Sequence, residues 1–141
     1  MGKVETNKKQ KNTTLLQTSF ELFTEKGFTK TTISDIVNRA GLAKGTFYLY
    51  FKDKYDLRDR LVTYKTSQLF GNAHTALIEQ NIQGFENQMF FVIDHIIDRL
   101  EKEPKLLQFI SKNLSWGIFK MLLRRLSRKI PDSFMITIRI C

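Results

Sequence analysis

Residues 41–51, which read GLAKGTFYLYF, combine residue types that favour phosphate binding with residue types that pack a core. Two glycines four positions apart enclose Lys44, and a lysine beside a helix start is suited to an anionic ligand. Gly45 removes a side chain at a point where a large partner would need close approach. Phe47 and Phe51, at i and i+4, share one helix face. The stretch therefore predicts a short helix that packs through its phenylalanines and presents a phosphate-binding side.

The preceding residues predict the helices that hold this segment. Residues 12–26 repeat apolar side chains at helical spacing, on a single side of the helix. This apolar stripe consists of Leu15, Leu16, Phe20 and Phe23. Gly27 follows at the position where helices often end in a left-handed residue, and Phe28 is placed to fold back against the helix.

A second helix is predicted at residues 33–40. Thr32 stands at its N-cap with Asp35 three residues on, which forms a capping box, and Gly41 ends the helix. Only two residues separate it from the third helix, at 44–51, so the two helices must meet across a tight turn. This is a helix-turn-helix, whose second helix is free to enter a DNA major groove. The phosphate is therefore predicted to be that of duplex DNA.

The run F-T-E-K-G-F-x-K-T-T-I-x-D-I-V-x-x-A-G-L-A-K-G-T-F-Y-L-Y-F-K-D-K-x-D-L resembles the DNA-binding head of the tetracycline-repressor (TetR) family. The resemblance covers residues 12 to about 60 without a gap. It implies an all-α regulator that binds palindromic operators as a homodimer. It also implies that a small molecule entering the C-terminal helical domain releases the operator.

The resemblance implies DNA contacts at the residues that occupy the family's contact positions. These are Thr32, Lys44, Gly45, Thr46, Tyr48, Leu49, Tyr50 and Lys54. Leu49 matches a position that can touch a thymine methyl, and Tyr50 replaces a frequent histidine that contacts phosphate. Lys54 matches a phosphate-binding lysine that opens the next helix. The simpler interpretation of Tyr48 and Tyr50 is that they are surface tyrosines. Ala43 departs from the family, which often has a serine or threonine cap there.

Charge agrees with a DNA-binding module. The 141 residues carry a net charge of +9, and residues 1–65 hold thirteen Lys and Arg against seven Asp and Glu. A basic head followed by a mildly acidic middle is typical of an anion-binding module joined to another domain. The N-terminal lysines belong either to a solvated tail or to an arm that follows the DNA backbone. They are Lys3, Lys8, Lys9 and Lys11.

The remaining residues predict a helical body. We expect a flexible basic arm at 1–11, the helix-turn-helix domain at 12–53, a helical regulatory and dimerisation domain at 54–130 and an atypical tail at 131–141. The body opens with a linking helix from Lys54 and continues with helices at 85–102 and from Pro104. Apolar residues on more than one side of the 85–102 helix predict burial on more than one side. Residues 85–122 are expected to form the homodimer contact.

Few residues of the body suggest chemistry. Five side chains are candidates for a pocket that takes a small hydrophobic effector, although filling the core is the plainer interpretation. They are Met89, Phe90, Phe109, Trp116 and Phe119. His95, flanked by Asp94 and Asp98, offers too few ligands for a metal site. No nucleophile–base pair and no Gly-rich nucleotide motif occurs, so neither an enzyme nor a cofactor is predicted.

The chain is expected to be cytoplasmic and not membrane-bound. The polar N-terminus lacks the apolar segment of a signal peptide, and the longest apolar run, MFFVI, is too short to span a bilayer. The single cysteine, Cys141, fits a reducing compartment. The predicted function is a DNA-binding transcriptional repressor released by a ligand. The alternative is a truncated or variant protein-interaction module whose head folds but binds DNA poorly, because the pattern stops before the family's usual dimer helices.

Overall fold

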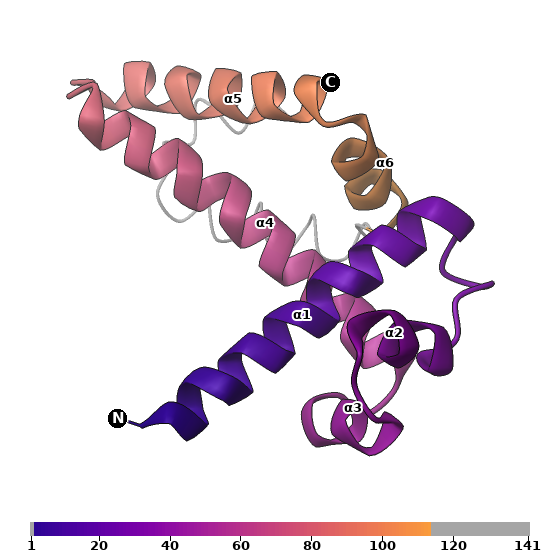
Figure 1. Ribbon diagram of the computed structural model, residues 1–141. Helices are drawn as coiled ribbons and strands as arrows, with labels where there is room; N and C mark the ends of the chain where they lie inside the picture. Colours follow the sequence, from indigo (N-terminus) through magenta and orange to yellow (C-terminus); the bar gives the residue numbers. More distant parts are fainter. Residues whose placement is uncertain (1, 114–141) are drawn as a thin grey trace. The chain divides into compact units, whose positions relative to one another are not determined.

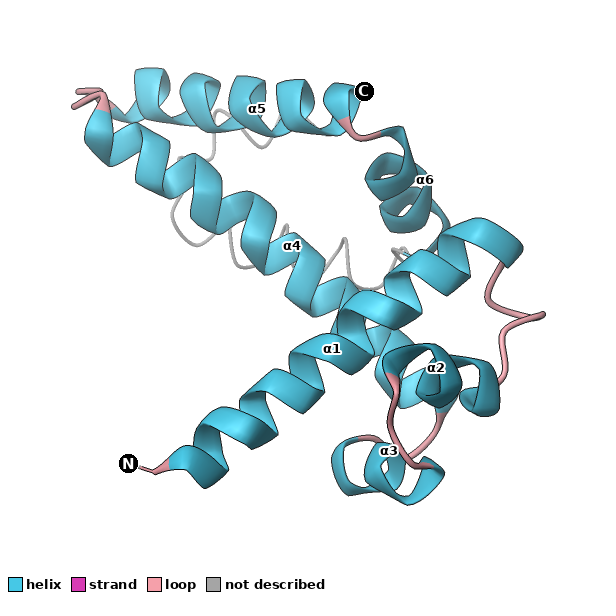
Figure 2. Cartoon of the chain, viewed as in Figure 1, coloured by secondary structure: helices cyan, strands magenta, loops and turns pink. Residues whose placement is uncertain are grey.

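The computed structural model describes residues 2–113, and every regular element within that range is a helix. Six helices follow in order: α1 (Lys3–Lys26), α2 (Ile33–Ala40), α3 (Lys44–Tyr50), α4 (Lys54–Glu79), α5 (Phe85–Lys102) and α6 (Pro104–Asn113). Figure 1 labels the helices, and Figure 2 shows that loops and turns connect them. The predicted all-α class is confirmed for these residues. The chain divides into compact units 1–110 and 111–141, and the contacts below lie within the first.

The first three helices and the start of α4 form the head, which has one core. α1 contacts α2 and α4, and α2 contacts α3. Each helix contributes completely buried side chains, which are Leu15, Ser19, Ile36, Phe47, Leu57 and Leu61. The predicted bounds of α2 are confirmed, whereas α3 ends at Tyr50, one residue before the predicted end. Phe51 adopts extended dihedral angles (φ −132°, ψ 140°) and so closes the helix while its ring stays buried.

The prediction of a flexible arm at residues 1–11 is wrong for residues 3–11. These residues form the first turns of α1, and all of them are exposed. The segment has four Lys, one Glu and one Gln among its nine residues, and all three residue types are good helix formers. It is also continuous with the packed half of α1, which provides the helical nucleus that an isolated short peptide would have to form alone.

Helix α5 has the predicted bounds but not the predicted burial. A turn with positive φ at Asn81 and Gly84 reverses the chain, and α5 then contacts α4 (Figure 1). No residue of α5 is buried, so the prediction of burial on more than one side is wrong. Its most exposed apolar side chains are Phe85, Phe90, Ile93 and Ile97, at 44–59%. Helical periodicity predicts which sides of a helix are apolar, but it does not predict how many neighbouring elements cover those sides.

Helix α6 begins at Pro104, as the sequence predicted, because proline needs no N–H partner in the first turn. Its Leu106 and Phe109 are buried. The later part of this predicted helix and the tail at 131–141 lie outside the described residues. Within residues 2–113, no helix combines the length and the apolarity needed to cross a membrane. The same residues contain no group of three His, Cys, Asp or Glu side chains placed to hold a metal ion.

Candidate nucleic-acid interface

A capping box and two ion pairs fix α2 against α1. Thr32 Oγ1 accepts a hydrogen bond from the Asp35 N–H at 3.0 Å, and the Thr32 N–H donates to Asp35 Oδ2 at 2.9 Å. Lys26 Nζ donates to the same carboxylate at 2.7 Å, and this bond, with those from Thr32, lowers the pKa of Asp35 to about 2. Arg39 pairs with Glu25 at 2.9 Å. The predicted capping box is confirmed, and the Thr32 hydroxyl keeps its own proton for a further acceptor.

The turn between α2 and α3 is set by the backbone. Gly41 has φ 70° and ψ 32°, a left-handed conformation that costs glycine little, and the Leu42 N–H donates to the Val37 carbonyl at 2.9 Å. Ala43 is the N-cap of α3 and makes no side-chain cap hydrogen bond. The orientation of α3 therefore depends on the Gly41 turn and on the packing of the helix, not on a side-chain cap.

Two phenylalanines anchor α3. Phe47 is completely buried and Phe51 is 2% exposed, and their ring centroids lie 5.6 Å apart. The ring of Tyr48, on the outer side of α3, meets the ring of Phe47 edge-on with centroids 5.3 Å apart. This contact with a buried residue helps to hold the Tyr48 ring in place. The predicted anchoring role of both phenylalanines is confirmed.

The opposite side of α3 carries most of the predicted contact residues. Lys44 and Tyr48 form one i, i+4 row, and Gly45 and Leu49 form the next; all four are exposed. Tyr48 is 53% exposed and Leu49 is 80% exposed. An apolar side chain left this open gains nothing from the protein core, but it suits contact with a thymine methyl. The two other predicted residues on α3, Thr46 and Tyr50, are half-buried.

Neither the backbone conformation nor the packing at position 45 requires a glycine. Its φ is not positive, and a Cβ built at this position would meet no atom within 4 Å. Alanine would therefore fit the free protein and would favour the helix by about 1 kcal/mol. Packing within the described residues therefore does not require a glycine at this position.

Lys54 makes internal contacts that the sequence did not reveal. Its Nζ donates to the carbonyl oxygens of Phe28 and Thr31 at 2.8 and 2.9 Å and lies 4.2 Å from the centroid of the Phe28 ring. Arg58 lies over the same ring at 4.8 Å, and Tyr55 meets it edge-on at 5.2 Å. Lys54 thus ties the start of α4 to the loop before α2 and uses two of its three ammonium donors in these bonds.

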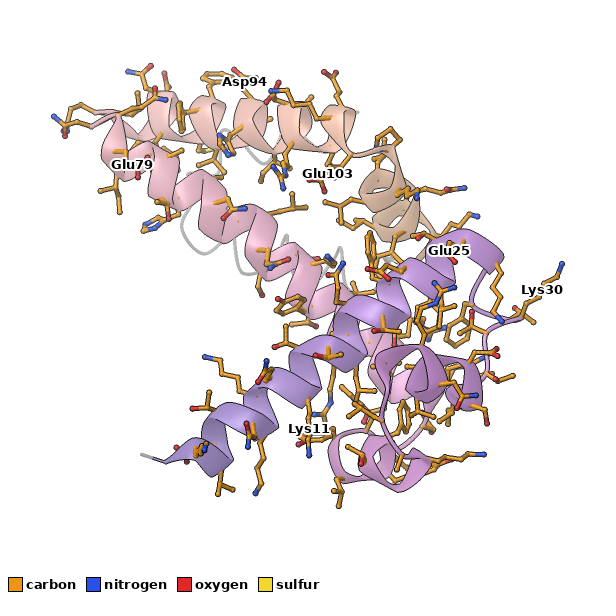
Figure 3. All side chains as sticks on the ribbon, viewed as in Figure 1. Lys11, Glu25, Lys30, Glu79, Asp94 and Glu103 are labelled. Atoms are coloured by element: carbon orange, nitrogen blue, oxygen red, sulfur yellow. The ribbon has the colours of Figure 1, made fainter. Side chains whose placement is uncertain are left out.

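A second set of contacts joins the head to α6. The rings of Phe20 and Phe109 meet edge-on with centroids 5.4 Å apart, and Lys65 Nζ lies 4.1 Å from the Phe20 centroid. Partial burial lowers the pKa of Lys65, and the carboxylates of Glu103 and Glu21 partly offset this effect. Glu103 lies at the connection between α5 and α6 (Figure 3). Sequence periodicity placed Phe20 and Phe109 on apolar faces, but it did not pair them.

The residues predicted to line an effector pocket are not gathered together in the described part of the chain. Met89 is half-buried and Phe90 is 59% exposed on α5, whereas Phe109 is buried on α6 against Phe20. Trp116 and Phe119 lie outside the described residues. The pocket itself stays a prediction.

Comparison with known proteins assigns the head to a family. Residues 15–61 match the family described as bacterial regulatory proteins, tetR family. Residues 15–61 thus form a TetR-family head. The matched residues run from the packed half of α1 through the helix-turn-helix to the first turns of α4, which are the elements that position the exposed side of α3.

Curated relatives also match the chain over about 64 residues. The chain is 45% identical to the HTH-type transcriptional regulator YvdT of Bacillus subtilis over 64 residues, which cover 43% of this chain and 33% of that protein. It is 34% identical to the HTH-type transcriptional repressor KstR2 of Rhodococcus jostii over 64 residues, or 45% of this chain and 31% of that protein. The matched part thus spans about a third of these curated relatives.

A solved structure extends the similarity beyond the head. A TetR family transcription regulator from Marinobacter aquaeolei VT8 superposes with a TM-score of 0.71 and 17% sequence identity. The superposition covers 88% of this chain and 66% of that protein. At this identity the similarity establishes the fold alone.

Proposed function

We propose that this chain is a DNA-binding transcriptional regulator of the repressor type, whose head binds duplex DNA through α3. The observation that carries the proposal is the exposed side of α3, where Lys44, Tyr48 and Leu49 stand on a helix anchored by Phe47. A firmly held helix of this kind presents polar and apolar groups to base edges. The positive charge of residues 1–65 attracts the phosphate backbone. The similarity to a transcriptional repressor supports the repressor role.

The proposed contacts divide by chemistry. Lys44, the free donor of Lys54 and the Thr32 hydroxyl bind phosphates, and Leu49 touches a thymine methyl. Tyr48 and Tyr50 donate to phosphate or to a base edge, while Gly45 and Thr46 allow the backbone of α3 to approach closely. In this proposal residues 12–53 are the DNA-binding domain and residues from 54 onward are regulatory.

The salt dependence of DNA binding tests this proposal. Lys44→Ala should weaken binding to every duplex and reduce the slope of log affinity against log salt by about one unit. Lys105→Ala, which removes an exposed lysine of α6, is the matched control and should leave the slope unchanged. A wild-type chain that fails to bind any duplex at about 50 mM salt would refute the function. Equal slopes for wild type and Lys44→Ala would remove Lys44 from the interface.

A palindromic operator requires two heads about 34–36 Å apart, so the proposed regulator acts as a homodimer. The exposed apolar side chains of α5 support a two-fold contact through residues 85–122, of which the structure describes 85–113. Sedimentation should give a dimer. A stable monomer at high micromolar concentration would favour the alternative of a helical interaction module with a poorly functional head.

A small hydrophobic effector is the proposed signal for release. It would bind near the predicted pocket residues Met89, Phe90, Phe109, Trp116 and Phe119. Because Phe109 packs on Phe20 of α1, an effector that displaced its ring would loosen a contact between α6 and the head. A compound that raises the melting temperature of the chain while weakening its DNA binding would support this step. A compound that changes one of these two quantities without the other would contradict it. Since its target is bacterial DNA, the proposed activity takes place in the cytoplasm.

A further inference from the structure

Lys65 of α4 places a charge among aromatic rings. Its Nζ lies 4.1 Å from the centroid of the Phe20 ring on α1. The ring of Phe109 on α6 meets the same Phe20 ring edge-on, with centroids 5.4 Å apart, and Phe109 is 4% exposed. We call these three residues the Lys65 junction, and we call the junction closed when Phe109 contacts Phe20. One cation and two rings thus join α1, α4 and α6.

Polar groups replace water only in part around the ammonium. Gln17 Oε1 accepts a hydrogen bond from Lys65 Nζ at 3.5 Å, a long and therefore weak bond. The carboxylates of Glu103 and Glu21 attract the ammonium, whereas the Arg99 guanidinium repels it. Glu103 also pairs with Arg99 at 2.6 Å, so its charge is shared between two cations. The polar partners of Lys65 are therefore weaker than the water that they replace.

Burial outweighs these attractions. It is the largest influence on Lys65, and it lowers the pKa of the ammonium below the ordinary 10.5. A lowered lysine pKa means that the closed junction disfavours the charged form relative to water. The cation–π contact with Phe20 reduces this penalty but does not replace the hydration shell of an ammonium. An apolar side chain of similar length, such as methionine, would fill the same position without a buried charge.

The core of the head does not include α6. Within the described residues, the completely buried apolar side chains come from α1 to α4, and they are Leu15, Ile36, Phe47, Leu57, Leu61 and Ala73. Movement of α6 away from α1 would separate Phe109 from Phe20 and leave these side chains in place. The same movement would uncover the Lys65 ammonium and return it to water. The junction is thus placed to open while the helix-turn-helix stays folded.

We propose that Lys65 is a charge switch, whose ammonium opposes the closed junction and makes α6 open more easily than it would over an uncharged side chain. This inference deepens the proposed release step, and it rests on the proposed function only for its effect on DNA. Hydration of the freed ammonium would assist an effector that displaces Phe109 from Phe20. Because a ligand shifts an equilibrium only by its differential affinity, a junction that opens easily responds to a weaker effector.

Amide hydrogen exchange of the full chain without DNA tests the switch. In the wild type, the amides of Leu107–Ile110 should be less protected than those of Ile36–Ala40, because α6 opens while the head stays folded. Lys65→Met removes the charge and keeps the length, so the protection of the α6 amides should rise at least about threefold. Lys105→Met, which changes an exposed lysine of α6, is the matched control and should leave this protection unchanged.

A second variant and the pH separate charge from packing. Lys65→Arg keeps the charge, so its α6 amides should be no better protected than those of the wild type. The penalty of burying the charge is fully present at neutral pH, and it is relieved as the pH rises from the lowered pKa toward 10.5, because the folded chain loses this proton first. The melting temperature of Lys65→Met should therefore exceed that of the wild type most near about pH 7, and by less toward about pH 10.

Three outcomes would overturn the switch. Lower protection of α6 in Lys65→Met would show that the ammonium holds the junction closed. Equal protection in the wild type and both Lys65 variants, or a difference in melting temperature that is constant with pH, would exclude the charge as the cause. Equal protection of α6 and α2 in the wild type would show that α6 opens only when the head unfolds. Failure of the chain to bind any duplex is a separate result, which would refute the proposed function and the link to release but not the opening of α6.

Discussion

In the head, Leu15, Ile36 and Phe47 are completely buried, whereas on α5 Phe85, Phe90 and Ile97 keep roughly half of their surface exposed. Apolar residues recur at helical spacing in both regions. Only in the head do neighbouring helices cover these residues, because α1, α2, α3 and the start of α4 pack around one core. Periodicity therefore predicts the apolar side of a helix, while the burial of that side depends on how many neighbouring elements reach it. The head covers its own apolar residues, whereas α5 leaves several of its apolar side chains exposed.

The largest expected effect contrasts one phenylalanine from each region. Phe47→Ala should lower the free energy of unfolding by about 3–5 kcal/mol, because it leaves a cavity in the head. Phe90→Ala, which changes a residue 59% exposed, should stay within about 0.5 kcal/mol. Urea denaturation of the two variants measures both values. Similar costs would mean that the contrast between the head and α5 does not exist in solution.

A smaller effect is expected where Lys54 ties α4 to the head. Lys54→Met keeps the apolar stem but removes the hydrogen bonds to the carbonyls of Phe28 and Thr31, so unfolding should become easier by about 1–3 kcal/mol. Thermal denaturation in the absence of DNA measures this change. An unchanged melting temperature would show that the ammonium contributes nothing internally and serves only an external partner.

The cap of α2 should matter less. Thr32→Ala removes the hydroxyl that accepts from the Asp35 N–H and should cost about 1 kcal/mol, whereas Thr32→Ser should restore most of the loss. Chemical denaturation of the two variants measures the difference. If serine fails to rescue alanine, the threonine methyl rather than the cap hydrogen bond would be the stabilising group.

The smallest effect is a pH dependence of the same cap. The pKa of Asp35 is about 2 in the folded chain against an ordinary 3.8, so its charged form stabilises the fold above about pH 4. This contribution is lost as the pH falls through the folded value. The difference in melting temperature between wild type and Asp35→Asn should therefore be largest at neutral pH and shrink toward pH 2. A difference that stays constant with pH would exclude the carboxylate charge as its cause.

Local features of the head were predictable from the sequence because they depend on neighbouring residues. Thr32 and Asp35 form a capping box through i, i+3 geometry, Gly41 supplies the left-handed turn, and Phe47 and Phe51 share a face at i, i+4. These relations follow from helix geometry alone.

Long-range features were not predictable from the sequence. Lys54 meets carbonyl oxygens 23 and 26 residues earlier in the chain, and Phe20 meets Phe109 across the fold. Residues 3–11 were predicted to be part of a flexible arm because a lysine-rich segment without an apolar stripe gives no periodic signal. Their helical form depends on the packed half of α1 that follows them.

In the proposed function, the chain binds DNA through the head and not through α5. Amide chemical shifts of the labelled full chain, followed by NMR during titration with an unlabelled duplex, test this most directly. We expect the largest chemical-shift changes at Thr32, across Lys44–Tyr50 and at Lys54, while the amides of α5 change little. Changes concentrated on Phe85–Lys102, or no change at saturating DNA, would contradict it.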